Sequence, residues 1–284
     1  MNDILNIIKE KSTTLSKSQK IISEYIVSNC EKAAYMTAAK LSEKTGVSES
    51  TVVRFATELG FDGYPALLKN LQAYVKAQMT SVQRMELAYE KMGSRDILTG
   101  TLKADIGYIE KTLENIDKAQ FEKAAMAISS AKKVYIIGVR SAACLAEFAG
   151  FYLNLIFSNV KLIKSTGGDD LFEQILNIGK DDVLIGISFP RYSKNTIKAL
   201  NYAKNNGATV IGITDSKASP IVSESEICLI AESDTTSFVD SLAAPLSLIN
   251  ALIVAVGMNN KDRMQKNLEK LERIWDEYEV YDKK

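Results

Sequence analysis

The chain has 284 residues, 46% of them hydrophobic, and it carries as many basic as acidic side chains, so its formal net charge is zero. This length suggests two domains of ~100–200 residues each. No apolar run reaches the ~18–20 residues that cross a bilayer, and the N-terminus MNDILNIIKE lacks the basic start and cleavage site of a signal peptide. The three cysteines lie far apart and there is no histidine, which argues against a disulfide framework and against the usual zinc sites. We therefore expect a cytoplasmic protein with no membrane contact, metal or cofactor.

The first predicted elements are helices, which fill residues 15–74. Five apolar residues recur at helical spacing near the start and are predicted to share one face: Leu15, Ile21, Ile22, Tyr25 and Ile26. Further along, Gly60 is predicted to end a helix, and Pro65 to open the next one at its first position.

Between these helices, residues 36–59 have the spacing of a helix-turn-helix. Thr37 can cap a first helix, Gly46 tolerates the positive φ at its end, and Ser48 can cap a second helix. On that second helix a buried stripe is predicted at positions i, i+3, i+4 and i+7, which are Val52, Phe55, Ala56 and Leu59. An ordinary helical hairpin is the alternative interpretation of this segment.

The second helix of such a motif reads DNA with the residues near its N-terminal end. Arg54, Glu49 and Ser50 lie on its outward face and are predicted to meet base edges. Ser48 and Thr51, together with the helix N-terminus at Thr37, are predicted to hold phosphates.

The charge of this region is low for a DNA-binding domain. Residues 1–80 contain ten basic and eight acidic side chains, a net of +2. Because non-specific affinity for DNA comes from Lys and Arg neutralising phosphates, we expect two copies to act together on paired half-sites. A protein whose helical domain mediates assembly without binding DNA is an alternative.

After a predicted helical linker, residues 99–115 are predicted to form an amphipathic helix whose outer face is charged. The pattern then changes to short apolar strands that alternate with helices. The predicted domains are 1–77 for the helix-turn-helix, 78–106 for the linker and 107–284 for the last domain. The strand segments are KKVYIIG, NVKLIK, DDVLIGIS, ATVIGIT and EICLIA. Near-continuous apolar strands of this kind belong to a parallel sheet covered by helices on both faces, so the fold class is an all-α domain followed by an α/β three-layer sandwich.

Two predicted strand ends carry chemistry that suits an anion. Gly138, Arg140 and Ser141 follow the first strand, while Ser188, Arg191 and Ser193 follow the third. Each junction brings hydroxyls, an arginine and free backbone N–H groups to the start of a helix. The two serines nearest the helices could instead be simple helix caps.

The whole chain resembles the RpiR-type bacterial transcriptional regulators, which join a helix-turn-helix to a sugar-isomerase (SIS) domain. The segments that carry the resemblance are YMTAAKLSEKTGVSESTVVRFATELGFDGYPALL, YIIGVRSAACLA, ISFPRYSKNTIKALNYAKNNGATVIGITD and FVDSLAAPLSLINALIVAV. It implies a flavodoxin-like sandwich that dimerises, and a regulator of carbohydrate metabolism that responds to a phosphorylated sugar.

The resemblance also places ligand-binding residues. The general SIS pattern is roughly S-x-S-G-x-T-x-x-T, in which Ser188, Ser193 and Thr196 match the first, a middle and the last position. Pro190 and Arg191 stand where a second serine and a glycine would be, and Arg140 replaces a glycine of the first motif. An anion site is still implied, and a carboxylated or differently phosphorylated metabolite is an alternative to the usual phosphosugar.

SIS domains also occur in sugar-phosphate isomerases, so an enzyme is a second hypothesis. Isomerisation needs a positioned base, and often a histidine to open the sugar ring, but this chain has no histidine. Glu147 and Lys194 could serve as the base, although both are expected on helix surfaces. We predict no catalytic residue.

Assembly is predicted to use the last two helices. Their apolar residues at helical spacing are Leu242, Leu246, Ile249, Leu252, Ile253 and Val256 on one helix, and Leu268, Leu271 and Trp275 on the other. These predict a homodimer or a tetramer, and an operator that is an inverted repeat.

Overall fold

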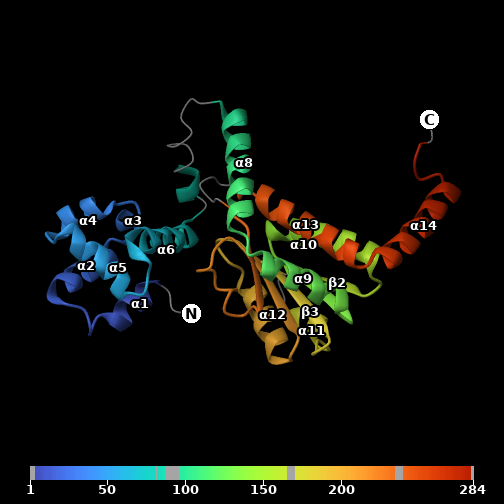
Figure 1. Ribbon diagram of the computed structural model, residues 1–284, viewed down its shortest axis with the longest axis horizontal. Coiled ribbons are helices and arrows are strands. Elements are labelled where there is room, and N and C mark those ends of the chain that lie inside the picture. The colour runs from blue at the N-terminus through green and yellow to red at the C-terminus, as the bar shows by residue number, and fades with distance from the viewer. Residues whose placement is uncertain (1–3, 81, 87–95, 165–169, 234–238, 283–284) are drawn as a thin grey trace. The chain divides into compact units, whose positions relative to one another are not determined.

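The computed structural model describes residues 4–80, 82–86, 96–164, 170–233 and 239–282. The chain separates into two compact units, Met1–Arg84 and Met85–Lys284. Each unit has its own core and is described by itself (Figure 1).

The N-terminal unit is helical, as predicted. Its helices are α1 (Ile4–Lys11), α2 (Lys17–Ser28), α3 (Cys30–Ala33), α4 (Ala38–Thr45), α5 (Glu49–Glu58) and α6 (Gly63–Gln78). Phe55 of α5 is fully buried, and α5 packs against α2, α4 and α6. One detail of the prediction is wrong: Ile21 is 43% exposed, because the buried face of α2 runs through Ile22 and Ile26.

The C-terminal unit begins with two helices and continues as alternating strands and helices. Its elements are α8 (Ile97–Asn115), α9 (Lys118–Ser130), β1 (Lys133–Gly138), α10 (Ala142–Ile156), β2 (Val160–Ile163), α11 (Asp170–Ile175), β3 (Asp182–Ile187), α12 (Lys194–Asn205), β4 (Thr209–Thr214), β5 (Ile227–Ile230), α13 (Ala243–Asn259) and α14 (Lys261–Glu277). All five predicted strands are present, which confirms the α/β class. The domain ranges 1–77, 78–106 and 107–284 remain a prediction, and the boundary at 106/107 falls inside the continuous helix α8.

The strands form one parallel sheet in the order β2-β1-β3-β4-β5. Alternate side chains enter two separate cores, because successive residues of a strand point to opposite faces. Ile136 and Ile185 pack toward α9, α10 and α13, whereas Tyr135 and Leu184 pack toward α11 and α12. Figure 1 shows these helices on the two sides of the sheet, which makes three layers.

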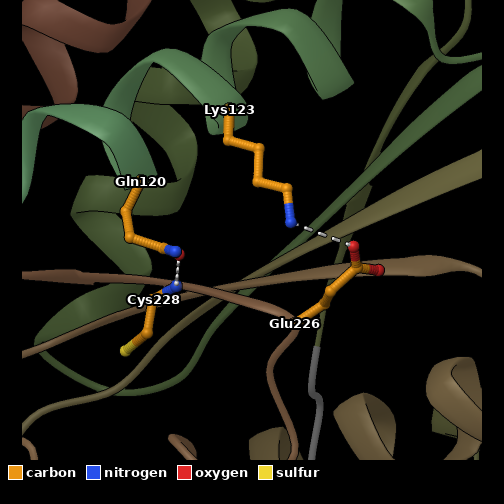
Figure 2. A network of polar contacts seen from close by, with 4 residues as sticks. All are labelled: Gln120, Lys123, Glu226 and Cys228. Atoms are coloured by element: carbon orange, nitrogen blue, oxygen red, sulfur yellow. Dashed lines mark hydrogen bonds and ion pairs between the residues drawn. The ribbon is translucent and has the colours of Figure 1, made fainter.

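Helix α9 covers the outer edge of the sheet at β5. Gln120 Oε1 accepts a hydrogen bond of 3.3 Å from the backbone N–H of Cys228, and Lys123 Nζ lies 3.7 Å from Glu226 Oε1 (Figure 2). An edge strand otherwise presents free backbone groups that can pair with other chains. The side chain of Gln120 satisfies one of these groups. Burial also raises the pKa of the Cys228 thiol to about 11, so this cysteine stays a protonated, unreactive thiol at neutral pH.

The first helix, α8, differs from its prediction. Its outer face was expected to be charged, but it exposes a stripe of apolar side chains: Ile97, Leu98, Leu102, Ile106, Ile109 and Leu113. At the other end of the unit, α14 has no buried residue. In the part of the chain that is described, no single helix is long and apolar enough to span a membrane; α13 and α14 meet those criteria only as a pair bent by 99°.

Candidate DNA-binding and ligand-binding sites

Helices α4 and α5 form the predicted helix-turn-helix, and local hydrogen bonds fix the turn between them. Thr37 caps α4 by accepting the N–H of Lys40, and Gly46 ends it with a φ of 68°. The hydroxyl of Ser42 donates to the carbonyl of Val47 at 2.5 Å. The small Ser42 thus ties the end of α4 to the turn, a contact that a larger side chain would block.

The start of α5 is capped by a cluster of hydroxyls. Ser48 Oγ accepts the N–H of Thr51, and it lies 2.9 Å from Ser50 Oγ and 2.8 Å from Thr51 Oγ1. The predicted phosphate-binding residues Ser48 and Thr51 therefore also stabilise the helix end.

The predicted base-reading residues share the exposed face of α5. Glu49, Ser50 and Arg54 are exposed, while Val52, Phe55 and Ala56 are buried beneath them. Arg54 Nε donates to the carbonyl of Ser50 at 3.3 Å, so the guanidinium lies along its own helix. This bond is exposed, and the side chain can leave it for a DNA base at small cost.

The second candidate site lies where β1 and β3 run side by side. Gly138 at the end of β1 pairs with Ile187 at the end of β3, so the two predicted junctions are neighbours at one edge of the sheet. After β1 the chain turns into α10 on one face, and after β3 it turns into α12 on the other. Ligands of open α/β sheets bind at such a topological switch point.

At the β1 junction the structure gives two residues a different local role from the expected one. A Cβ on Gly138 would lie 2.3 Å from the carbonyl oxygen of Ala142, so the glycine is needed for the close approach of α10. Ser141 makes no side-chain cap to α10; its hydroxyl donates to Asp240 Oδ2 at 2.9 Å.

At the β3 junction the serines hold the loop. Buried Ser188 accepts the backbone N–H of Ser193 at 3.2 Å, and Ser193 caps α12 by accepting the N–H of Thr196 at 3.4 Å. Thr196 is fully buried, and among the described residues its Oγ1 has no hydrogen-bond partner. A buried hydroxyl without a partner is costly, and a ligand or a water molecule bound there would relieve the cost.

Both junctions contain an arginine in the left-handed region of backbone conformation. Arg140 has a φ of 61° and Arg191 a φ of 63°, and both side chains are exposed. This conformation costs roughly 1–2 kcal/mol for a residue with a Cβ, which is why glycine is common there. Strained residues that persist at the ligand edge of a sheet point to a function for the side chain. The proposed enzyme bases Glu147 and Lys194 are exposed on α10 and α12.

A buried polar network beside the β3 junction was missed in the sequence analysis. The hydroxyl of Tyr192 donates to Asp215 Oδ1 at 3.0 Å, and the hydroxyl of Thr214 lies 3.2 Å from the same oxygen. Burial raises the pKa of Asp215 to about 6. Burial and the Asp215 carboxylate together raise the pKa of Tyr192 above its usual range. The only sequence signal was an aspartate directly after a predicted strand, which looked like an ordinary turn residue.

Family models match both units. The helix-turn-helix domain of the rpiR family matches residues 2–78, and the SIS domain matches residues 127–255. The N-terminal unit is thus a helix-turn-helix domain of the rpiR family, and the C-terminal unit contains a SIS domain. An HTH-type transcriptional regulator of Caldanaerobacter subterraneus is 25% identical over 96% of this chain and 97% of its own length. The regulator HexR of Escherichia coli is 24% identical over 95% of this chain and 93% of its own length.

Solved structures agree with this assignment of the fold. The sugar isomerase domain of an RpiR transcription factor from Sphaerobacter thermophilus superposes with a TM-score of 0.60 and 25% identity, over 63% of this chain and 99% of that one. The Vibrio vulnificus NanR protein complexed with ManNAc-6P superposes with a TM-score of 0.58 and 19% identity, over 95% of this chain and 98% of that one.

Proposed function

We propose that this RpiR-type protein is a DNA-binding transcriptional regulator of carbohydrate metabolism whose SIS domain binds a small anionic metabolite without transforming it. The observation that carries the proposal is the pairing of two units in one chain. The first presents Arg54 on a capped, exposed helix, and the second places two anion-suited junctions side by side at the switch point of its sheet.

The DNA contact is proposed to depend on the exposed face of α5. Arg54 would read a guanine, with Glu49 and Ser50 beside it, while Ser48, Thr51 and the helix N-terminus at Thr37 would hold phosphates.

Arg54→Ala is expected to lower the affinity for operator DNA by about 1–3 kcal/mol per half-site and to relax the preference at one base pair of each half-site. The reason is the loss of a bidentate contact to a base edge. A fluorescence-anisotropy titration with operator and random duplexes measures both effects. Lys20→Ala, which removes an exposed cation from α2, is the matched control. An unchanged ratio of operator to random affinity in Arg54→Ala would show that Arg54 does not read a base.

The ligand is proposed to be a phosphorylated sugar or a related anionic metabolite. Arg140 and Arg191 would supply charge, and the hydroxyls of Ser141, Ser188, Ser193 and Thr196 would supply hydrogen bonds. The solved NanR structure, complexed with ManNAc-6P, has the same fold and supports this class of ligand. A thermal-shift screen with phosphorylated sugars and sugar acids tests it. A true ligand at ~100 times its dissociation constant would stabilise the protein by about 2.7 kcal/mol.

The double variant Arg191→Ala, Ser193→Ala is expected to abolish the effect of this metabolite on operator binding and to leave ligand-free operator binding unchanged. It removes a cation and the cap of α12 from the β3 junction, far from the DNA-reading helix in sequence. Operator titrations with and without the metabolite measure the effect. Lys198→Ala removes a cation from the middle of the same helix and is the control. If the double variant still responds to the metabolite, the ligand site lies elsewhere.

An isomerase remains the second candidate, because Asp215 is a partly buried carboxylate with a raised pKa near the ligand edge. Two hydroxyls already bond this carboxylate, from Tyr192 and Thr214, which favours a structural role over that of a base. Turnover of the identified metabolite by the wild-type protein would contradict the binding-only proposal.

Useful affinity for DNA is proposed to come from a homodimer, or a tetramer, on an inverted repeat. In the C-terminal unit, Ile249, Leu252, Ile253 and Val256 belong to the core, which leaves α14 and the exposed Leu246 for assembly. A groove of about 930 Å³ runs between α10, α13 and α14, and its lining includes Tyr152, Val254, Met258 and Leu268.

A further inference from the structure

A chain of hydrogen bonds joins the β1 junction to α8, the first helix of the C-terminal unit. Ser141 Oγ donates to Asp240 Oδ2 at 2.9 Å. The next residue, Ser241, donates its hydroxyl to Asp105 Oδ1 of α8 at 2.6 Å. Three segments that are remote in the sequence therefore meet through two adjacent residues.

A second contact holds the same region to α8. The backbone N–H of Glu232, just after β5, donates to Thr112 Oγ1 of α8 at 2.9 Å. The hydroxyl of Ser233 donates to the carbonyl of Ser241 at 2.8 Å. The described residues on both sides of the β5–α13 connection are thus bound to α8 and to each other.

The carboxylate of Asp240 accepts its hydrogen bond from the N-cap residue of α10. Ser141 is the N-cap of this helix, and its side chain makes no cap hydrogen bond to the backbone N–H groups of the helix. The positive end of a helix dipole favours a negative charge at that place. The anionic group of a ligand bound at the β1 junction needs the same hydroxyl and the same helix end.

We propose that, without ligand, the carboxylate of Asp240 occupies the position at the start of α10 that the ligand's anionic group takes. A bound anion displaces this carboxylate. Because Ser241 follows Asp240 directly, this displacement breaks the contact between Ser241 and Asp105 and loosens α8. The inference rests on the proposed ligand site and adds the route by which that site acts on the DNA-binding unit.

The first test measures the affinity of the full chain for inorganic phosphate by isothermal titration calorimetry. Asp240→Asn keeps an oxygen that accepts from Ser141 but removes the competing charge, so we expect it to bind phosphate about tenfold more tightly than the wild type. Asp181→Asn neutralises an exposed carboxylate just before β3, at the opposite end of the strand from the ligand site. This variant should bind phosphate like the wild type. Phosphate binding that is detected for Asp240→Asn but not for the wild type would also support the proposal.

Two other results would overturn it, and they are distinguishable. Equal affinity of Asp240→Asn and the wild type would refute the competition and leave the anion site in place. Absence of binding in both proteins would remove the anion site, and with it the proposed ligand site at this edge.

The second test follows hydrogen exchange of the α8 amides. Phosphate should speed exchange around Asp105 in the wild type, and in Asp240→Asn, which keeps the bond to Ser141, it should do so at a lower phosphate concentration. Ser241→Ala cuts the link to Asp105 while keeping Asp240, so its α8 should no longer respond to phosphate, and its phosphate affinity should rise because binding no longer has to break that contact. An α8 that responds in Ser241→Ala as in the wild type would show that the signal takes another route.

Discussion

Leu268→Glu combined with Leu271→Glu is expected to convert the protein to a monomer and to weaken operator binding about 10²–10⁴-fold, the range by which a second linked binding event raises affinity. Both leucines lie on α14, which buries no residue in the single chain, and Leu268 lines the groove beside α10 and α13. Met264 at the start of α14 packs against the core, but Leu268 and Leu271 further along are only partly buried. An amphipathic helix that leaves part of its apolar face uncovered favours a partner, and a carboxylate there would be costly to bury. Sedimentation equilibrium and operator titrations measure the two effects.

The control is Lys270→Glu, which adds negative charge to the exposed side of the same helix and should leave both properties unchanged. Circular dichroism should show that the double variant keeps its helices, because neither leucine belongs to the core of the unit. A wild-type protein that sediments as a monomer at micromolar concentration would refute the homodimer. A monomeric double variant with full operator affinity would refute the role of pairing in DNA binding.

Local signals predicted much of the helix-turn-helix, because its chemistry is local. The caps Thr37 and Ser48 and the left-handed Gly46 act within a few residues, and each has the predicted role in the structure. The strand segments were also predictable, since buried parallel strands are almost continuously apolar.

Contacts between distant segments were not predictable in this way. Nothing near Ser141 in the sequence shows that its hydroxyl bonds to Asp240, which lies 99 residues away. Gly138 was predicted to lie at an anion-suited junction, but nothing in the sequence shows that α10 approaches it so closely that a Cβ would lie 2.3 Å from the carbonyl oxygen of Ala142. The apolar stripe on α8 was mistaken for an inner face because periodicity identifies a helix face without showing what covers it.

Asp215 illustrates the same limit for electrostatics. In the sequence, an aspartate directly after a strand is typical of a turn. Only the fold shows that the side chain of Asp215 lies next to Tyr192 and Thr214 and is largely removed from solvent. The resulting shift in pKa predicts how the stability of the C-terminal unit depends on pH.

Asp215→Asn is expected to stabilise the C-terminal unit by about 2–3 kcal/mol more at pH 7.5 than at pH 4. Burial raises the pKa of Asp215 to about 6 in the folded protein, above its value of 3.8 in the unfolded chain. The protonated carboxyl group of Asp215 therefore contributes a stabilisation of the folded unit that is fully present below about pH 4. This contribution is lost as the pH rises through 6. Asparagine stays neutral across this range and avoids the loss.

Urea unfolding followed by the fluorescence of Trp275, the single tryptophan of the chain, reports on the C-terminal unit. Any hydrogen bond that asparagine makes less well than a protonated aspartate lowers the stability by the same amount at each pH, so it cancels in the comparison between pH values. Asp181→Asn, at an exposed position, supplies the baseline for losing one carboxylate. If Asp215→Asn and Asp181→Asn differ from the wild type in the same way at both pH values, the carboxylate of Asp215 is not held in a costly buried state.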